Sequence, residues 1–219
     1  MKSAIVIGAT GLVGRECVKQ LVTRPEFERV TAVARRALPD QLQSSRLRTV
    51  LIDFDRLDER SDAFQASHVF CALGTTIKQA GSQQRFRQVD FEYPLRVAEL
   101  ALAAGARHFL LVSSVGASPA SRGFYLKVKG ELERAIVALG FPSVTVVRPS
   151  LLLGDRKEFR LGEEIATRLS WAFPRAYRAV HVREVAGALV NAAVEDRPGL
   201  RTIENTDIIR GLGPAGTMG

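Results

Sequence analysis

The chain has few of the residues that build disulfide frameworks and zinc sites. It contains 2 cysteines in 219 residues, which excludes the cysteine-dense scaffold of small secreted domains. A zinc site is not expected from so few cysteines either, and we predict no metal. Cys17 falls in a predicted helix and Cys71 in a predicted strand, so we expect both to be small buried core residues.

Long apolar runs and a leader-like N-terminus are also absent. No run approaches the roughly 20 apolar residues that a membrane helix needs. The first residues enter a strand without a charged-then-apolar signal region. We therefore expect a cytoplasmic protein that has no membrane partner.

Acidic residues are in the minority. Lysine and arginine number 31 against 23 aspartate and glutamate residues, for a net charge of +8. A basic surface attracts nucleic acid or anionic ligands, but the arginines are spread along the chain, without a long basic run or interleaved aromatic residues. We interpret the excess as solvated surface charge and predict no specific nucleic-acid partner.

Strand-like and helix-like segments alternate along the chain. Most strand-like runs are continuous Val, Ile, Leu and Ala, which indicates strands buried on both faces of a parallel sheet. Without a linker or repeat, the sequence predicts one α/β domain over residues 1–219, a doubly wound parallel sheet of the Rossmann type. The predicted strands are 4–7, 29–34, 48–52, 68–73, 107–113, 143–148 and 200–204, and the predicted helices are 12–23, 83–104, 123–139, 162–171 and 182–194.

Residues 149–181 lack strand character and contain aromatic and basic side chains. We expect this segment to form a small C-terminal cap over the cleft, suited to an apolar or anionic small-molecule substrate. His181 precedes the last predicted helix and is expected to cap or pack rather than to catalyse.

The chain opens with a strand, a glycine-rich turn and a helix. Three glycines spaced three apart follow the apolar run 4–7, and helical spacing begins between the second and the third. The first N–H groups of a helix lack intrahelical partners and bind anions, and glycines let the backbone approach phosphates closely. This context predicts a dinucleotide site. The residues expected to contact the cofactor here are Gly8, Thr10, Gly11, Leu12, Val13 and Gly14.

The second predicted strand lacks the acidic residue that an NAD site places at its end. Arg35 and Arg36 stand there instead, and a guanidinium suits a 2′-phosphate in charge and geometry. Each charge-assisted hydrogen bond is worth about 1.5–3 kcal/mol. Two or three such bonds favour the phosphorylated cofactor on the order of a hundredfold or more, so we predict NADP(H).

Other strand ends supply further candidate cofactor contacts. Asp53 closes the third predicted strand, where its carboxylate can meet the adenine amino group; a plain loop aspartate is the alternative. Leu73 and Gly74 close the fourth strand, and the glycine allows backbone near the cofactor ribose. Pro149 follows the sixth strand and is expected near the nicotinamide.

A serine pair, a tyrosine and a lysine form the candidate catalytic set. Ser113 and Ser114 end the fifth strand, and Tyr125 and Lys129 share one face of the following helix. Tyrosine is a poor base at neutral pH, but a neighbouring ammonium group favours the phenolate form. The tyrosine can then exchange a proton with a carbonyl or hydroxyl group, which a serine hydroxyl orients. Which serine does so is left open by the sequence.

Together these motifs resemble the short-chain dehydrogenase/reductase superfamily. The glycine turn over residues 8–14 is similar to its atypical and extended branch. Residues 112–117, 124–131 and 147–150 resemble the Tat-interacting-protein-like oxidoreductases, which are related to the NmrA-like proteins. The resemblance covers about the first 210 residues. It implies a Rossmann fold, NADP(H), and catalytic roles for Ser114 or Ser113, Tyr125 and Lys129.

Two functions therefore compete. The first is an NADPH-dependent reductase that transfers hydride to a carbonyl-type small molecule. The second is a redox-sensing regulator that binds NADP(H) and a protein partner without turnover, as NmrA-like relatives suggest. Such regulators often lack the tyrosine, whereas this chain keeps Tyr125, which favours the enzyme.

Overall fold

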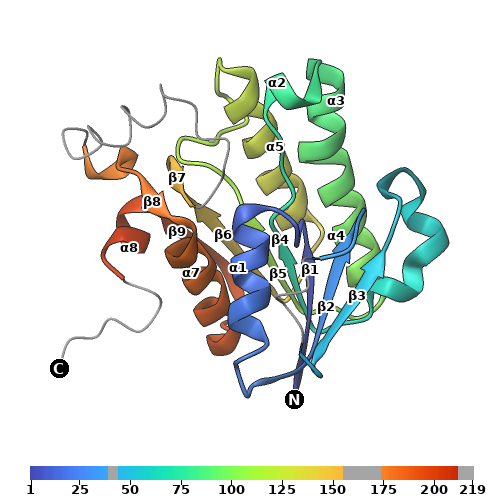
Figure 1. Ribbon diagram of the computed structural model, residues 1–219. Helices are drawn as coiled ribbons and strands as arrows, with labels where there is room; N and C mark the ends of the chain where they lie inside the picture. The colour runs from blue at the N-terminus through green and yellow to red at the C-terminus, as the bar shows by residue number, and fades with distance from the viewer. Residues whose placement is uncertain (39–43, 155–173, 212–219) are drawn as a thin grey trace.

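A parallel β-sheet forms the centre of the molecule (Figure 1). The computed structural model describes residues 1–38, 44–154 and 174–211. In the described part, seven strands pair in the order β3-β2-β1-β4-β5-β6-β9, and every pairing is parallel. The strands are β1 (Lys2–Ile7), β2 (Phe27–Ala34), β3 (Leu47–Leu51), β4 (His68–Cys71), β5 (His108–Val112), β6 (Ser143–Arg148) and β9 (Gly199–Glu204).

Helices cover both faces of the sheet (Figure 1). On one face, α1 (Leu12–Leu21) and α7 (Val182–Glu195) pack side by side over Ala4 and Val6 of β1. On the other face, α4 (Tyr93–Ala103) and α5 (Phe124–Ala138) pack over Ile5 and Ile7 of the same strand. Because successive side chains of a strand point to opposite faces, the continuous apolar run of β1 supplies both cores.

The strand order reverses between β1 and β4, since the chain proceeds outward from β1 to β3 and then returns to the other side of β1. At such a switch point the two connections leave in opposite directions, which opens a crevice outside the carboxyl ends of the strands. The doubly wound parallel sheet that the sequence predicts is confirmed. For each of the seven strands, the predicted first and last residues lie within two positions of the observed ones.

The predicted helix 83–104 is three joined segments. These are α3 (Gln83–Arg87), a π-helical turn η3 (Gln88–Glu92) and α4. Short elements that the sequence analysis missed are η2 (Phe54–Phe64), α2 (Ile77–Ala80), η5 (Arg175–Tyr177) and α8 (Asn205–Ile209).

The predicted cap is described only at its two ends. The absence of strands from this segment was a wrong prediction, because β7 (Leu152–Leu153) and β8 (Val180–His181) form a small parallel pair. Two residues in each strand are too few to show as a pattern in sequence. The rest of the cap, with the predicted helix 162–171, lies outside the described residues.

Three single-residue predictions are confirmed. Cys17 and Cys71 are buried free thiols, and burial raises the pKa of Cys71 to about 11. His181 caps α7: its Nδ1 accepts the Arg183 N–H at 3.2 Å, while Glu184 accepts the His181 N–H. Among the described residues, no helix combines the length and apolarity needed to cross a membrane.

Candidate functional site

The turn after β1 is built from close backbone contacts. Gly8 has a φ of +78°, and a Cβ there would lie 2.6 Å from the Ala72 carbonyl oxygen. A Cβ on Gly14 would lie 2.2 Å from the Gly8 carbonyl oxygen. Any larger residue at either position must move backbone, so the glycines let α1 begin directly against the turn, with Gly11 as its N-cap residue.

The N-terminus of α1 faces a cleft at the carboxyl ends of the strands, with a volume of about 960 Å³. Gly11 has no side chain to cap the helix, so the first N–H groups of α1 are left for a bound anion. The described residues that line the cleft are Gly11, Leu12, Val13, Ala72, Leu73, Gly74, Thr75, Thr76, Lys78, Gln79, Asp90, Val112, Ser113, Ser114, Tyr125, Lys129, Pro149, Ser150, Leu151 and Leu152.

Most of the sequence-predicted site residues therefore meet in one place. Gly8 and Thr10 belong to the turn and Gly14 to the first turn of α1, and none of the three lines the cleft. The predicted residues that do line it are Gly11, Leu12, Val13, Leu73, Gly74, Ser113, Ser114, Tyr125, Lys129 and Pro149.

The predicted adenosine-side residues lie outside the cleft lining. Arg35 and Arg36 are exposed just after β2, at the same sheet edge as the cleft. Asp53 is exposed, and its carboxylate accepts the Asp55 N–H at 3.0 Å as the N-cap of η2. Asp53 thus has the local role of a loop aspartate, and its contact with adenine stays a prediction.

The two serines at the end of β5 have different partners. The Ser113 hydroxyl is buried and donates to Glu133 Oε1 on α5. Glu133 also accepts from Arg148 at 3.0 and 2.5 Å, and Arg148 reaches Glu204 at 3.0 Å. Ser114 is half-buried, and its hydroxyl has only a long 3.4 Å contact with the Val115 carbonyl. Through Glu133 and Arg148, the Ser113 hydroxyl thus belongs to a network that links β5, α5, β6 and β9. The Ser114 hydroxyl, by contrast, is available to a ligand.

Lys129 is held by a carboxylate that the sequence analysis did not identify. Its Nζ lies 2.8 Å from Asp90 Oδ1, and both side chains are buried. Asp90 Oδ2 accepts the Thr75 N–H at 2.8 Å. A Cβ on Gly74 would lie 3.3 Å from Asp90 Oδ1, so this predicted glycine leaves room for the ion pair.

The protonation of Lys129 follows from these surroundings. Burial favours the neutral amine, but the charge of Asp90, with smaller contributions from Tyr125 and the Asp90 hydrogen bond, outweighs it. The net effect raises the pKa of Lys129 above its ordinary value. Lys129 is therefore an ammonium group at neutral pH, and it lines the cleft.

Tyr125 lies in the first turn of α5, one helical turn before Lys129. Its ring packs against buried Phe86, with 5.7 Å between the ring centroids. A Cβ on Gly130 would lie 2.3 Å from the Ser118 carbonyl carbon, so α5 packs tightly against the loop that carries Ser114. The helix and the strand end are thereby fixed relative to each other.

Asp90, Lys78 and Gln79 are among the polar cleft residues that sequence reasoning missed. Asp90 lies in the π-helical turn η3, a feature frequent at functional sites, but neither this turn nor the ion pair has a local sequence pattern. Lys78 and Gln79 lie on α2, which is one turn long. The one available signal for Asp90 was its place between the apolar residues Val89 and Phe91 of a predicted helix.

Comparisons with known proteins agree with this geometry. Residues 8–196 match a family model described as NAD(P)H-binding. The chain is 38% identical to Protein HTATIP2 of Rattus norvegicus over 214 residues, covering 95% of this chain and 88% of that protein. It is also 38% identical over 168 residues to Protein FMP52, mitochondrial, of Candida albicans, covering 75% of this chain and 73% of that protein.

Solved structures show the same fold at lower sequence identity. MoeE5 in complex with UDP-glucose and NAD superimposes with a TM-score of 0.68 at 22% identity, covering 92% of this chain and 76% of that one. The crystal structure of gox2253 gives a TM-score of 0.73 at 19% identity, covering 93% and 70%. At these identities the likeness concerns the fold.

Proposed function

This chain belongs to the NAD(P)H-binding family, in the atypical short-chain dehydrogenase/reductase group, and on that premise we propose that it is an NADPH-dependent reductase of a carbonyl-type small molecule. One observation carries the proposal. Ser114, Tyr125 and Lys129 line the same cleft as the N-terminus of α1, so a proton donor and a dinucleotide site share one cavity.

The residues of the turn fit a dinucleotide. Side chains at Gly8 and Gly14 would collide with backbone, which keeps the approach to α1 open for a pyrophosphate on its first N–H groups. Pro149 and Leu73 line the same cleft beside the strand ends, where the nicotinamide half would lie. NADPH, when bound, supplies the hydride that reduces the carbonyl carbon.

The chain's own residues handle the proton. In this proposal the Tyr125 hydroxyl donates its proton to the carbonyl oxygen as that oxygen gains negative charge. The Ser114 hydroxyl donates a hydrogen bond to the same oxygen and orients it. The Lys129 ammonium stabilises the tyrosine phenolate left behind, and Asp90 holds this ammonium in position.

The preference for NADP(H) over NAD(H) rests on Arg35 and Arg36. Both side chains are exposed at the cleft edge of the sheet, and no described residue forms an ion pair with either. The pair is therefore available for a 2′-phosphate. Replacing both with serine should weaken NADPH binding on the order of a hundredfold while leaving NADH binding within a few-fold; equal loss of both cofactors would refute the assignment.

The deciding experiment for the reaction is Tyr125→Phe. We expect kcat/KM for a carbonyl substrate, found by screening a panel for NADPH oxidation, to fall about 10²–10⁴-fold, while the Kd of NADPH stays unchanged. Tyr93→Phe is the matched control, because Tyr93 lies outside the cleft lining. This variant should keep the kcat/KM of the wild type. Full turnover in Tyr125→Phe would exclude the proposed proton donor.

The non-catalytic regulator is the other outcome of this screen. A wild-type chain that binds NADPH, oxidises it with no carbonyl compound, and binds a protein partner differently with each redox state of the cofactor would be a sensor. The proposal also places the protein in the cytoplasm. Since the FMP52 relatives are named mitochondrial proteins, cell fractionation is the test of that location.

A further inference from the structure

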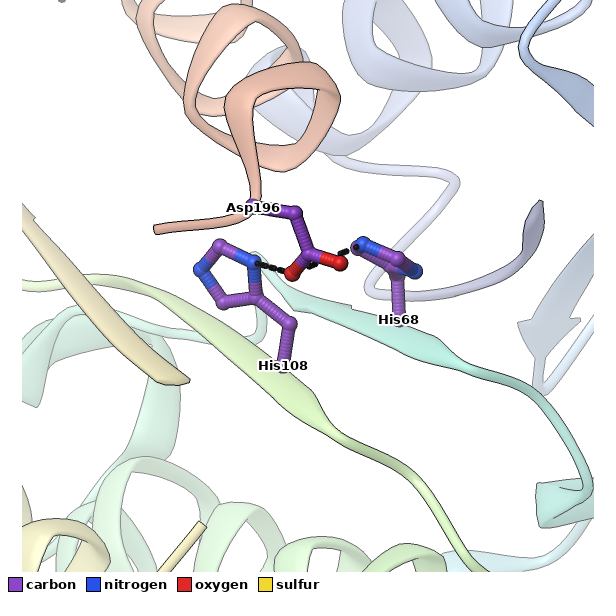
Figure 2. Close-up of side chains that lie close together, drawn as sticks. All are labelled: His68, His108 and Asp196. Atoms are coloured by element: carbon purple, nitrogen blue, oxygen red, sulfur yellow. Dashed lines mark hydrogen bonds and ion pairs between the residues drawn. The ribbon is translucent and has the colours of Figure 1, made fainter. Parts of the chain in front are cut away.

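Three side chains that are distant in sequence meet at the edge of the sheet opposite the cleft. His68 is the first residue of β4, His108 is the first residue of β5, and Asp196 is the C-cap residue of α7. Figure 2 shows both imidazole rings beside the Asp196 carboxylate. Asp196 Oδ1 lies 3.3 Å from His68 Nε2 and 3.0 Å from His108 Nδ1.

The cluster is enclosed but not sealed. His68 and His108 are each 1% exposed, while the Asp196 side chain is 23% exposed. One nitrogen from each ring and one carboxylate oxygen lie within 4.8 Å of one another. Tetrahedral zinc, with ligand distances near 2.0–2.2 Å, holds its ligand atoms about 3.3–3.5 Å apart, so modest side-chain rotation brings the three atoms onto one ion.

The hydrogen bonds around His68 leave one of its ring nitrogens, Nε2, without a hydrogen-bond partner. The Ser67 hydroxyl donates to the Ser3 carbonyl at 2.9 Å and accepts the Ser3 N–H at 2.9 Å. Because the Ser67 hydroxyl already donates its one proton to Ser3, Ser67 Oγ acts as the acceptor for His68 Nδ1–H at 2.8 Å. His68 Nε2 then presents a bare lone pair to the carboxylate, and it is a buried atom without a hydrogen-bond partner.

His108 can adopt the same arrangement. Its Nε2 lies 2.9 Å from Thr145 Oγ1, and a hydroxyl accepts as readily as it donates. With the ring proton on Nε2, Nδ1 is free to bind a cation next to Asp196. Serine and threonine thus take the place of the hydrogen-bond acceptors that orient metal-binding histidines in known sites.

We propose that His68 Nε2, His108 Nδ1 and Asp196 form a binding site for a divalent zinc-class ion, with water as the fourth ligand. Two imidazole nitrogens and one carboxylate oxygen are a common zinc donor set. The ion would join the end of α7 to the first residues of β4 and β5, far from the proposed reaction. The sequence predicted no metal because it has few cysteines, and these three ligands lie too far apart in the chain to form a motif.

The charge state of the cluster suits a cation at neutral pH. Burial lowers the pKa of His68 to about 4, and burial also lowers the pKa of His108, so both rings are neutral ligands. Burial alone would raise the pKa of Asp196, but its surroundings, the Lys2 ammonium group among them, lower it, so the carboxylate is ionised. Lys2 Nζ lies 3.9 Å from Asp196 Oδ2, on the second oxygen, and it limits the affinity without occupying the site.

The test is Zn²⁺ titration of the untagged full chain, after dialysis against a chelator, by calorimetry and thermal unfolding. We expect one Zn²⁺ per chain and an unfolding midpoint raised by roughly 5–10 °C at a hundredfold excess over Kd. His68→Gln should abolish the stoichiometric binding, and Thr145→Val should weaken it about tenfold. His181→Gln is the matched control, because His181 is the third histidine of the chain and is exposed at the other end of α7.

A second measurement, on the wild-type chain, tests the proposal even if a variant fails to fold. Histidine ring NMR signals should shift with Zn²⁺ for two of the three histidines and stay fixed for His181. The proposal is overturned by the absence of stoichiometric binding, by equal binding in folded His68→Gln, or by a Zn²⁺ response confined to His181.

Discussion

The buried ion pair of Lys129 and Asp90 makes Asp90→Asn the perturbation with the sharpest consequence. Asparagine keeps the side-chain volume, and its oxygen can still accept the Thr75 N–H, but it removes the negative charge 2.8 Å from Lys129 Nζ. Removing one partner of a buried pair costs about 3–5 kcal/mol, because an uncompensated charge remains inside the protein. We expect a loss of this size in the free energy of unfolding at pH 7.

The free energy of unfolding should depend on pH differently in the wild type and in Asp90→Asn. In the wild type the folded-state pKa of Lys129 is raised above 10.5, so the stabilisation is complete at neutral pH and is lost as the pH rises through that raised pKa. In Asp90→Asn, burial acts without the carboxylate and lowers the folded-state pKa. The folded variant then releases its proton before the unfolded chain does, and its stability increases with pH.

Urea unfolding followed by circular dichroism at several pH values between 7 and 10 measures both effects. The gap between wild type and Asp90→Asn should narrow as the pH rises. Asp58→Asn is the control, because Asp58 forms its ion pair with Arg96 at the surface, where such pairs contribute about 0–1 kcal/mol. A loss below 1 kcal/mol for Asp90→Asn, or a gap independent of pH, would refute the reasoning.

The remaining predictions concern the glycine turn, the serines and a thiol. Gly14→Ala should abolish NADPH binding or folding, because its Cβ would lie 2.2 Å from backbone, whereas Gly187→Ala, with 3.7 Å to its nearest neighbour in the middle of α7, should stabilise by about 0.5–1 kcal/mol in thermal unfolding. Ser114→Ala should reduce kcat at least tenfold with stability unchanged, and Ser113→Ala should destabilise by about 1–3 kcal/mol because Glu133 loses a partner; equal effects on kcat would contradict the assignment. Cys71, buried with the pKa of its thiol raised to about 11, should resist a thiol reagent at pH 8 until urea unfolds the chain, and rapid native labelling would contradict its burial.

Local sequence patterns predicted most of the elements of the fold. Continuous apolar runs mark parallel strands because burial on both faces removes the alternation, and so all seven strands of the sheet were predicted from sequence. The short elements α2 and β7 escaped prediction, since one turn or two residues is too short for any periodicity to appear. The break in the helix 83–104 escaped too, because a π-helical segment of 5 residues is too short to show a period of its own in sequence.

The site was predictable only where its residues are neighbours in the chain. Gly8, Gly11 and Gly14 lie along the turn and the start of α1, and Tyr125 and Lys129 share one helix face, so spacing alone connects them. The contribution of Asp90 could not be predicted, because its contact with Lys129 exists only after α5 packs beside η3.

The sequence by itself determined the parallel sheet, the dinucleotide turn and the order of the serine, tyrosine and lysine, because these depend on backbone preferences and on spacing within one element. The tertiary structure decided which serine hydroxyl is free, which carboxylate holds Lys129, and that His108 meets Asp196 across 88 positions. Such pairings are set by how helices pack on the sheet, since packing alone brings side chains from separate elements within hydrogen-bond distance and removes the water between them.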